Sequence, residues 1–186
     1  MDGWPIHGRR THRGDPPAEP DLTDRRFTHV TIVAYKQPGI VRVCSDGALW
    51  EEYRMTATSG RPGPKLRQGD GQIPEGSYGI AALNPNSGYH LSLRISYPND
   101  DDRARSQRAG VRDCGGDIYI HGDHASIGCI AIGDHAIERL FYAVEESGFA
   151  QVKVLIAPRP EFDESLRQSA DGPLYARLFA EIAQLR

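Results

Sequence analysis

Three short strand-forming segments between residues 28 and 57 are separated by tight-turn sequences. The first, "THVTIVAYK", alternates β-branched with polar residues, and "QPG" then leads into "IVRVCS". A second turn sequence, "SDG", leads into "ALWEEYRMTA". Segments joined by so few residues return beside one another as antiparallel hairpins. The pattern therefore predicts a meander of short strands, and the 20 glycines and 13 prolines of the chain favour a β-rich fold with many turns.

The rest of the chain adds further strands and two helices, which together predict a mainly β fold with a few helices (α+β). Strands are predicted in "SYGIAAL" and "YHLSLRISY", joined by the turn "NPNSG", and in "DIYI", "IAI" and "QVKVLIA". One helix is predicted over 134–147, with Asp134 as its N-cap and Gly148 as its end, and a second over 173–185. The apolar faces of the two helices are formed by Ile137, Leu140, Phe141 and Val144 and by Leu174, Leu178, Ile182 and Leu185.

Three other segments lack such periodicity. Residues 59–76 hold five glycines and three prolines, and they are predicted to form a long structured loop. Residues 98–116 are polar and highly charged, and they are predicted to form a second long loop or a lid. Residues 1–26 combine prolines and mixed charges with few core-forming residues, which predicts a disordered tail. Without this tail, residues 27–186 are predicted to form a single domain that is long enough to bury a core.

The overall composition excludes several classes of protein. A net charge of −3 gives no strongly basic surface for nucleic acid. Three cysteines are too few for a disulfide framework, and whether Cys44 and Cys114 pair is left open. No apolar run is long enough to span a membrane. The N-terminal segment lacks the apolar core of a secretory signal peptide, so the protein stays inside the cell, is exported by another route, or has lost its true start.

The stretch "IYIHGDHASIGCIA", residues 118–131, carries a candidate thiol nucleophile and its base. A thiol attacks only as the thiolate, and a nearby imidazole can take its proton. His121 ends an apolar strand, and Cys129 follows eight residues later, after a turn of small residues. In such a turn the N–H groups of Ile127, Gly128 and Cys129 can point at one place, as in an oxyanion hole. Both features predict a thiol pKa for Cys129 below the usual value of about 8.5.

The same residues have two other interpretations. Cys129 can be a buried small apolar residue and His121 a satisfied strand residue, which is the commoner situation for this spacing alone. A metal site is the other interpretation, since four side chains lie within fifteen positions, namely His121, His124, Cys129 and His135. Their spacing matches neither a zinc finger nor a His-Glu-x-x-His helix, so no metal site is predicted.

From about residue 29 to residue 157 the chain resembles the L,D-transpeptidase catalytic (YkuD-like) family, and within it the YafK-like branch. The resemblance is carried by "SGRPGPKLRQGDGQIPEGSYGI", "LNPNSGYHLSLRISYPNDDDRA" and "IYIHGDHASIGCIAIGD", which occur in the order and at the spacing of the family. It implies a β-sandwich-like domain with the cysteine at one end of a sheet. It also implies that His121, in a His-Gly step, is the base and that Cys129, in a Ser-x-Gly-Cys step, is the nucleophile.

Two positions depart from the better-known members of the family, which carry His in place of Ile127 and Arg or Asn in place of Ala131. The YafK-like branch shares the short His-to-Cys interval and a similar Gly-Cys-x-Ala step. Gly128 and Ser126 complete the predicted catalytic turn, in which the hydroxyl of Ser126 orients either the turn or His121.

Substrate-binding residues are predicted from the same segments at Tyr89, His90, Arg103 and Gly122. For Tyr89 and His90 the alternative is strand-end packing. For Arg103, which follows Asp102, the alternative is a solvated ion pair that contributes little to stability. Gly122 is expected to let the backbone bend close to the site.

The resemblance implies a cysteine acyl-transfer enzyme that acts on peptidoglycan stem peptides without a cofactor. Cys129 attacks the carbonyl of a diaminopimelate residue, and an amine or water resolves the acyl-enzyme. The activity is then that of an L,D-transpeptidase, or the related hydrolysis by an L,D-carboxypeptidase or amidase. The implied place of action is the periplasm or cell envelope, with the cytoplasm or non-classical secretion as the alternative.

Two other functions remain open from the sequence. One is a non-catalytic murein-binding module, although the intact His-Gly and Gly-Cys steps argue against it. The other is a cysteine amidase with a different substrate, for instance a delivered effector. The sequence does not fix the oligomeric state.

Overall fold

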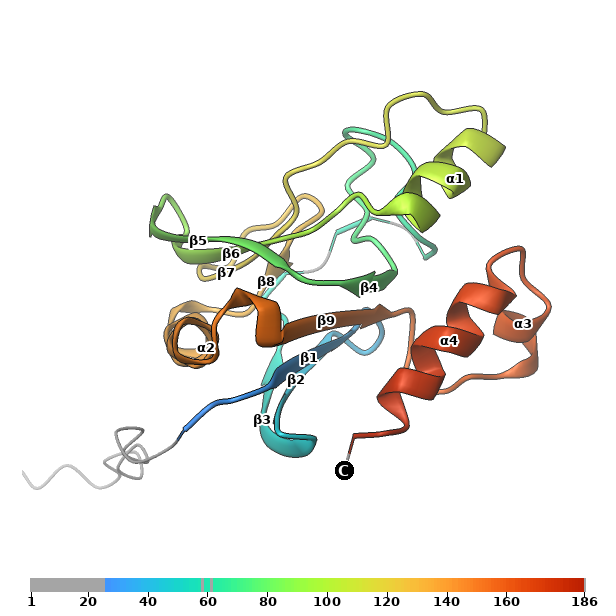
Figure 1. Cartoon of the computed structure of the whole chain (residues 1–186). Coiled ribbons are helices and arrows are strands. Elements are labelled where there is room, and N and C mark those ends of the chain that lie inside the picture. The colour runs from blue at the N-terminus through green and yellow to red at the C-terminus, as the bar shows by residue number, and fades with distance from the viewer. Residues whose placement is uncertain (1–25, 58, 61, 186) are drawn as a thin grey trace, which may run out of the picture.

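The computed structural model describes residues 26–57, 59–60 and 62–185, so the predicted tail lies outside the described residues apart from Arg26. Two β-sheets lie one above the other, and helices flank them on two sides (Figure 1). The first sheet has the order β3-β2-β1-β9-β4, formed by β1 Val30–Tyr35, β2 Ile40–Ser45, β3 Ala48–Arg54, β4 Gly76–Tyr78 and β9 Val152–Ala157. The second has the order β5-β6-β7-β8, formed by β5 Ile80–Ser87, β6 His90–Ile95, β7 Tyr119–His121 and β8 Ile130–Ala131. The helices are α1 Asp100–Arg108, α2 Asp134–Ser147, α3 Glu164–Arg167 and α4 Gly172–Ile182, with a 3-10 turn η1 at Phe149–Gln151.

The three N-terminal strands form the predicted meander. β1 pairs antiparallel with β2, and β2 pairs antiparallel with β3. The turn before β3 is built from Asp46 and Gly47, whose φ angles of 52° and 83° suit a tight hairpin. On its other side β1 pairs in parallel with β9, which brings a late segment of the chain into the centre of the sheet. The two sheets and the flanking helices confirm the predicted α+β class.

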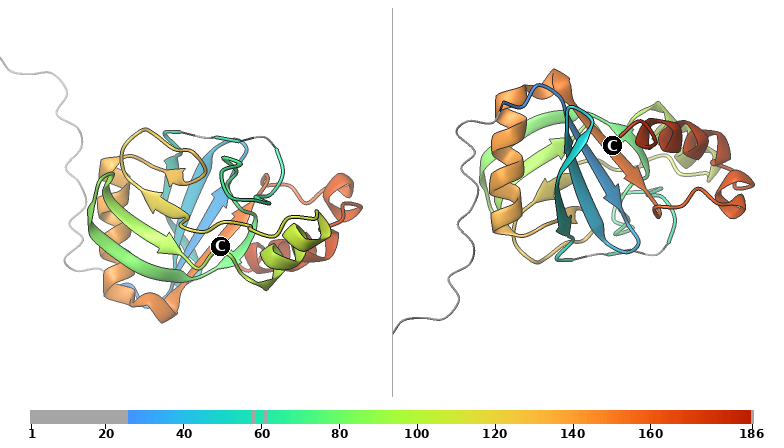
Figure 2. Two further views of the ribbon diagram at one scale, coloured as in Figure 1. Left: turned by 90° about the horizontal axis from the view of Figure 1, so that it is seen from above. Right: turned by 90° about the horizontal axis from the view of Figure 1, so that it is seen from below.

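The main core lies between the two sheets and beneath α2. The predicted apolar face of α2 is buried there, at Ile137, Leu140, Phe141 and Val144. A second cluster lies where α4 packs on β9, and it buries Leu174 and Leu178 with Ile182 and Leu185 packed against them. In Figure 2, α2 runs along one side of the sheets, whereas α1, α3 and α4 gather at the opposite side.

The segment predicted as one strand, 77–83, is divided between the two sheets. β4 pairs with β9, whereas β5 pairs with β6. The chain crosses at Gly79, whose N–H and carbonyl oxygen both bond to Ser96, at 2.9 Å each. The predicted turn over 84–88 is also wrong, because β5 continues to Ser87 with a register shift. Alternation alone does not reveal either change, since a strand keeps its period when it changes partner.

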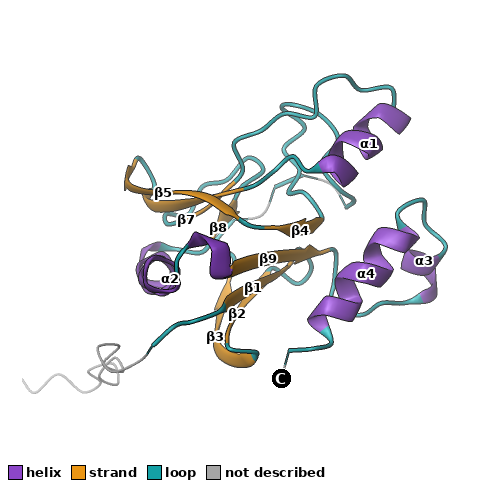
Figure 3. Ribbon diagram, viewed as in Figure 1, coloured by secondary structure: helices purple, strands orange, loops and turns teal. Residues whose placement is uncertain are grey.

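α1 occupies the first half of the segment that was predicted to be a loop or lid (Figure 3). A capping box starts it, in which the Asn99 side chain accepts the N–H of Asp102 and the Asp102 carboxylate accepts the N–H of Asn99. Acidic residues fill its first turn and Arg105 and Arg108 its last, which suits the helix dipole. Because α1 has no apolar stripe, hydrophobic periodicity does not reveal it.

The start of α2 differs from the prediction in one respect. Gly133 is the N-cap and has no side-chain capping bond, whereas Asp134 is the first helical residue. Its Oδ1 accepts the N–H of Asp123 at 2.7 Å, so the carboxylate ties the segment after β7 to α2. Gly148 ends the helix as predicted, with a φ of 77°.

Candidate active site

Strand pairing in the second sheet aligns four residues in one row across it. From β5 to β8 they are Asn84, Ser92, His121 and Ala131. Because side chains alternate along a strand, the neighbouring row points to the opposite face, into the core, with Leu83, Leu93, Ile120 and Ile130. Cys129 precedes β8 by one residue, so it shares the face of His121 and lies diagonally across from it on the adjacent strand.

Cys129 and His121 line one cavity of about 200 Å³. The other residues that line it are Asn84, Ser87, Gly88, Tyr89, Ser92 and Tyr119. Of these, only Tyr89 is predicted from the sequence. Asn84, Ser92 and Tyr119 join the cavity through strand register, and Ser87 and Gly88 through the reversal between β5 and β6. One weak signal is present in "YHLSLRISY", where Ser92 stands between two leucines and is buried. A buried hydroxyl between apolar neighbours indicates that this face of the strand has a role other than core packing.

The imidazole of His121 is held in one tautomer. Nδ1 lies 2.6 Å from the carbonyl oxygen of Gly122, which accepts the Nδ1–H. Nε2 is then left with a free lone pair, as a general base requires. The residue is only 2% exposed, and the ring of Tyr89 lies on it with centroids 4.7 Å apart. Burial lowers the pKa of His121, although the bond to Gly122 and the charge of Asp123 act in the opposite direction.

The thiol of Cys129 contacts a backbone carbonyl rather than the imidazole. Sγ lies 3.8 Å from the carbonyl oxygen of Asp117, and among the described residues no hydrogen bond joins it to His121. Burial raises the pKa of the Cys129 thiol, and it outweighs the Tyr119 N–H and the Lys65 charge, which favour the thiolate. The predicted lowering of this pKa is therefore wrong.

Ser126 organises the turn that carries the thiol. Its Oγ donates to the carbonyl oxygen of Cys129 at 2.7 Å and accepts the N–H of Gly128 at 3.3 Å. Ser126 thus orients the turn and not His121. Since the Gly128 N–H is occupied, the N–H of Cys129, which has no acceptor among the described residues, is the turn donor that a developing oxyanion can use. Gly128 has a φ of 122°, and a Cβ there would lie 3.2 Å from the carbonyl oxygen of Gln72.

The reversal between β5 and β6, residues 87–90, is called the hairpin tip here, and it is fixed against His121. The Tyr89 ring covers the imidazole, and the Tyr89 carbonyl oxygen packs so closely on Gly122 that a Cβ there would lie 2.9 Å away. His90 turns the other way, and its Nε2 lies 2.6 Å from Oε1 of Glu138 on α2. Tyr89 therefore lines the cavity, whereas His90 anchors the hairpin tip to α2.

Two of the predicted substrate-binding residues lie elsewhere. Gly122 is buried, and the space that a Cβ would need is taken by Oδ1 of Asp134, 2.5 Å away, so this glycine permits close packing behind the cavity. Arg103 lies on the exposed side of α1, where its Nη1 is 3.3 Å from Asp100. The structure does not bring Arg103 into the cavity with Cys129 and His121.

Three further observations concern the described part of the chain. All three cysteines are free, with Cys44 buried and Cys114 and Cys129 half-buried. Within residues 26–57, 59–60 and 62–185, no group of three or more His, Cys, Asp or Glu side chains is placed to hold a metal ion. Among the same residues, no helix has the length and apolar composition that crossing a bilayer requires.

Known proteins share the sequence and the fold of this chain. YafK of Escherichia coli (strain K12), which is named only as a candidate L,D-transpeptidase, is 35% identical over 125 residues, covering 64% of this chain and 48% of YafK. The chain thus spans about half the length of the curated relatives that it matches. The helical cell shape determining protein Pgp2 of Campylobacter jejuni superposes with a TM-score of 0.53 at 23% identity, covering 74% of this chain and 53% of Pgp2. Bd1075 of Bdellovibrio bacteriovorus gives a TM-score of 0.51 at 18% identity, covering 84% and 56% of the two chains.

The two structural likenesses show a shared fold. The sequence match is more specific, because the model of the YkuD family, the L,D-transpeptidase catalytic domain, matches residues 29–156. That range includes both sheets except the last residue of β9, and it includes the cavity and the turn that carries Cys129. The chain therefore belongs to the YkuD family of L,D-transpeptidase catalytic domains.

Proposed function

We propose that the chain is a cysteine acyl-transfer enzyme of the L,D-transpeptidase type, with Cys129 as nucleophile and His121 as general base. The observation that carries the proposal is the placement of both side chains on one face of adjacent parallel strands, where they line one cavity. The bond between Nδ1 and the Gly122 carbonyl supports it, because it leaves Nε2 free to take a proton. Membership of the family supports the same chemistry.

The thiol and the imidazole are both neutral in the resting state that we propose. Burial raises the pKa of Cys129 and lowers that of His121, and each shift favours the uncharged form. The mechanism is then general-base catalysis, in which the proton leaves the sulfur as the substrate carbonyl is attacked. The Cys129 side chain rotates away from the Asp117 carbonyl to reach Nε2, or one water molecule bridges the two.

The proposed reaction has two halves. A bond forms between Sγ and the substrate carbonyl carbon while Nε2 of His121 takes the thiol proton, and the oxyanion accepts a hydrogen bond from the Cys129 N–H. Collapse of this intermediate breaks the C–N bond, and Nε2 returns the proton to the departing amine. The thioester on Cys129 is then resolved by an incoming amine, which gives transfer, or by water, which gives hydrolysis.

The proposed substrate class is the peptidoglycan stem peptide, with attack at the carbonyl of a diaminopimelate residue. Family membership supports this choice, and it makes the cell envelope or periplasm the proposed place of action. Tyr89 is 49% exposed and lines the cavity, and we propose that its ring contacts the bound peptide. The proposed chemistry uses side chains and backbone groups alone.

Mass spectrometry of the intact chain after incubation with a tetrapeptide muropeptide tests the proposal. The expected result is an acyl adduct on Cys129, located by peptide mapping, together with released product. Cys129→Ala should form neither while its circular dichroism is unchanged, because a methyl group cannot attack. His121→Ala should slow adduct formation by about 10²- to 10⁴-fold. Cys114→Ala, which changes another half-buried cysteine, is the matched control and should behave like the parent chain.

Two outcomes would contradict the assignment in different ways. Turnover by a well-folded Cys129→Ala variant would remove this residue as the nucleophile. Binding of the muropeptide without any adduct or product would indicate a murein-binding module in place of an enzyme.

A further inference from the structure

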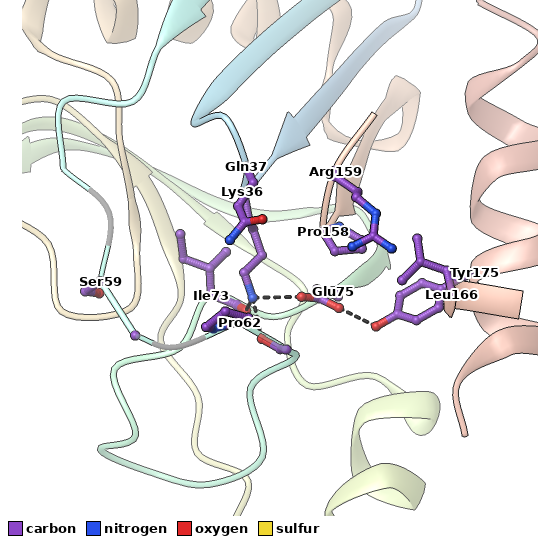
Figure 4. A pocket seen from close by; sticks show the side chains of 12 residues that line it. Lys36, Gln37, Ser59, Pro62, Ile73, Glu75, Pro158, Arg159, Leu166 and Tyr175 are labelled. Carbon is purple, nitrogen blue, oxygen red and sulfur yellow. Dashed lines mark hydrogen bonds and ion pairs between the residues drawn. The ribbon is translucent and has the colours of Figure 1, made fainter. Parts of the chain in front are cut away.

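The glycine- and proline-rich loop is anchored where it returns to the first sheet. Lys36 Nζ lies 2.8 Å from Oε1 of Glu75 and also donates to the carbonyl oxygen of Ile73. The hydroxyl of Tyr175 donates to the other oxygen of Glu75, so that this carboxylate lies between Lys36 and Tyr175 (Figure 4). Since these buried groups all bond to one another, the base of the loop cannot shift without breaking hydrogen bonds.

Asp70 closes the middle of the same loop, residues 65–72, which is called the inner loop here. Its two carboxylate oxygens accept four hydrogen bonds, of 2.8 to 3.1 Å, from the ammonium of Lys65 and from the N–H groups of Leu66, Arg67 and Gln72. Burial acts to raise the pKa of this carboxyl, but the hydrogen bonds together lower it. Because a largely buried carboxylate is costly without its partners, this convergence of donors fixes the shape of the inner loop.

The inner loop rests on residues 126–129, which are called the nucleophile turn here. A Cβ at Gly128 would lie 3.2 Å from the carbonyl oxygen of Gln72 and 3.4 Å from the carbonyl carbon of Gly71. The backbone of the inner loop is therefore in close contact with the residue that precedes Cys129. Since Asp70 binds the N–H of Gln72, the same residue that meets Gly128 is held directly by the Asp70 carboxylate.

The nucleophile turn needs such support from outside. Gly128 has a φ of 122°, and a glycine can leave such a conformation as easily as it adopts it. The N–H of Cys129 has no acceptor among the described residues, so no hydrogen bond of its own holds its direction. The hydroxyl of Ser126 is the internal tie of the turn, and the contact with the inner loop restrains Gly128 from the other side.

Electrostatics also place the inner loop near the sulfur. Burial raises the pKa of the Cys129 thiol and the charge of Asp117 acts in the same direction, whereas the N–H of Tyr119 and the charge of Lys65 favour the thiolate. Lys65 is 4% exposed, so its charge acts through the protein, where solvent screens it little. Asp70 fixes the position of this charge as well as the shape of the loop.

We propose that Asp70 is a positioning residue for the proposed reaction, which acts through the inner loop on Gly128 and keeps the Cys129 N–H directed at the developing oxyanion. The inference rests on the proposed function, because this direction matters only if an oxyanion forms there. Asp70 does not line the cavity of Cys129 and His121, so its effect is on the geometry of the turn and not on the binding of substrate.

Asp70→Ala tests the inference by two measurements. With the tetrapeptide muropeptide, kcat should fall by about 10- to 100-fold because the oxyanion donor is misplaced, whereas KM should stay within about twofold. Without substrate, hydrogen exchange followed by NMR should show the N–H of Gly128, which bonds to Ser126, exchanging about tenfold faster. Asp70→Asn keeps an oxygen that can accept the N–H groups of Leu66 and Arg67, so it should give intermediate values and keep the test open if Asp70→Ala does not fold.

Asp163→Ala is the matched control, since the Asp163 carboxylate also accepts a backbone N–H, that of Leu166, but it lies before α3. This variant should keep the parental kcat and the parental exchange rate at Gly128.

Two results would overturn the inference alone. One is faster exchange within the inner loop of Asp70→Ala with parental exchange at Gly128, because Asp70 would then shape its own loop without acting on the turn. The other is a parental kcat in Asp70→Ala, which would leave the proposed function standing. If the parent chain itself forms no acyl adduct, the proposed function fails first, and the role of Asp70 in it fails as a consequence.

Discussion

His121 determines how the proposed activity depends on pH. The imidazole must be neutral to accept the thiol proton, so activity is lost as the pH falls through its pKa. Burial lowers that pKa below its ordinary value of about 6.5. We therefore expect kcat/KM to stay high at pH 6.5 and to fall only at lower pH. A profile of kcat/KM against pH with the muropeptide substrate measures this limb, and a midpoint above 7 would contradict the burial argument.

The thiol of Cys129 gives an independent prediction that needs no substrate. Because burial raises its pKa, iodoacetamide at pH 8 should label Cys129 in the resting chain more slowly than it labels free cysteine, whose pKa is about 8.5. Peptide mapping of the alkylated protein across a pH series gives the curve for this residue alone. A labelling midpoint below pH 7 would show a preformed thiolate–imidazolium pair, and general-base catalysis would have to be abandoned.

The hairpin tip joins two elements that lie far apart in the sequence. The pair of His90 and Glu138 joins it to α2, and the Tyr89 ring over His121 joins it to β7. His90 has a φ of 69°, which is uncommon for a residue with a side chain and shows that the surroundings hold it there. We infer that Glu138 acts on the site through this tip, as a positioning residue, by keeping His121 covered.

Glu138→Gln tests this inference. Loosening the tip should expose the imidazole, and the loss of burial should raise the pKa of His121 toward about 6.5. An NMR titration of the His121 ring protons measures this pKa directly, without turnover. Glu145→Gln changes another exposed glutamate of the same helix and should leave the titration unchanged. If Glu138→Gln leaves the His121 pKa where it was, the pair is only a surface contact.

Buried charges connect the helices at one end of the molecule. Arg105 of α1 bonds to Asp102 at 3.0 Å, to Asp171 before α4 at 2.9 Å, and to the carbonyl oxygen of Glu75. The hydroxyl of Tyr78, on β4, also donates to Asp102. One guanidinium therefore links two helices and a sheet. Such a group stabilises the fold only while its partners are present, because an unpaired buried charge is costly.

Asp102→Ala should accordingly be among the more damaging substitutions away from the candidate active site. It removes the carboxylate half of the capping box of α1, which leaves the N–H of Asn99 without its acceptor, and one partner of buried Arg105. We therefore expect a loss of about 3–5 kcal/mol in the free energy of unfolding. Urea denaturation followed by circular dichroism measures it. Asp101→Ala, on the same helix turn, removes an exposed pair with Arg177 and should cost less than about 1 kcal/mol. Equal losses of unfolding free energy in the two variants would mean that the buried network adds no more stability than the exposed pair.

Much of the fold can be predicted from local patterns. The first three strands, α2 and α4 follow from alternation, from turn residues and from apolar faces, because each of these signals is contained in a few neighbouring residues. α1 is missed because capping and buried ion pairs stabilise it, and neither leaves an apolar period. The division of 77–83 between two sheets is missed because only distant partners distinguish β4 from β5.

The residues of the candidate site fall into the same two groups, those that local sequence patterns reveal and those that only the tertiary fold brings together. The sequence can single out His121 and Cys129, because their residue types and the Gly-rich turn have chemical meaning in themselves. Asn84 and Ser92 join them only through strand register. The direction of the Cys129 pKa is missed for a related reason, since burial depends on which segments pack over the turn.

The uncharged thiol of Cys129 also protects the sulfur from oxidation. Peroxide and disulfide exchange consume the thiolate, so a sulfur held as thiol reacts slowly with both. Burial raises the pKa of Cys44 as well, and neither residue is bonded to another cysteine. In a compartment without cytoplasmic reductants, where unpaired cysteines are readily oxidised, such a chain keeps its proposed nucleophile intact until a substrate fills the cavity and, in the proposed mechanism, His121 takes the proton.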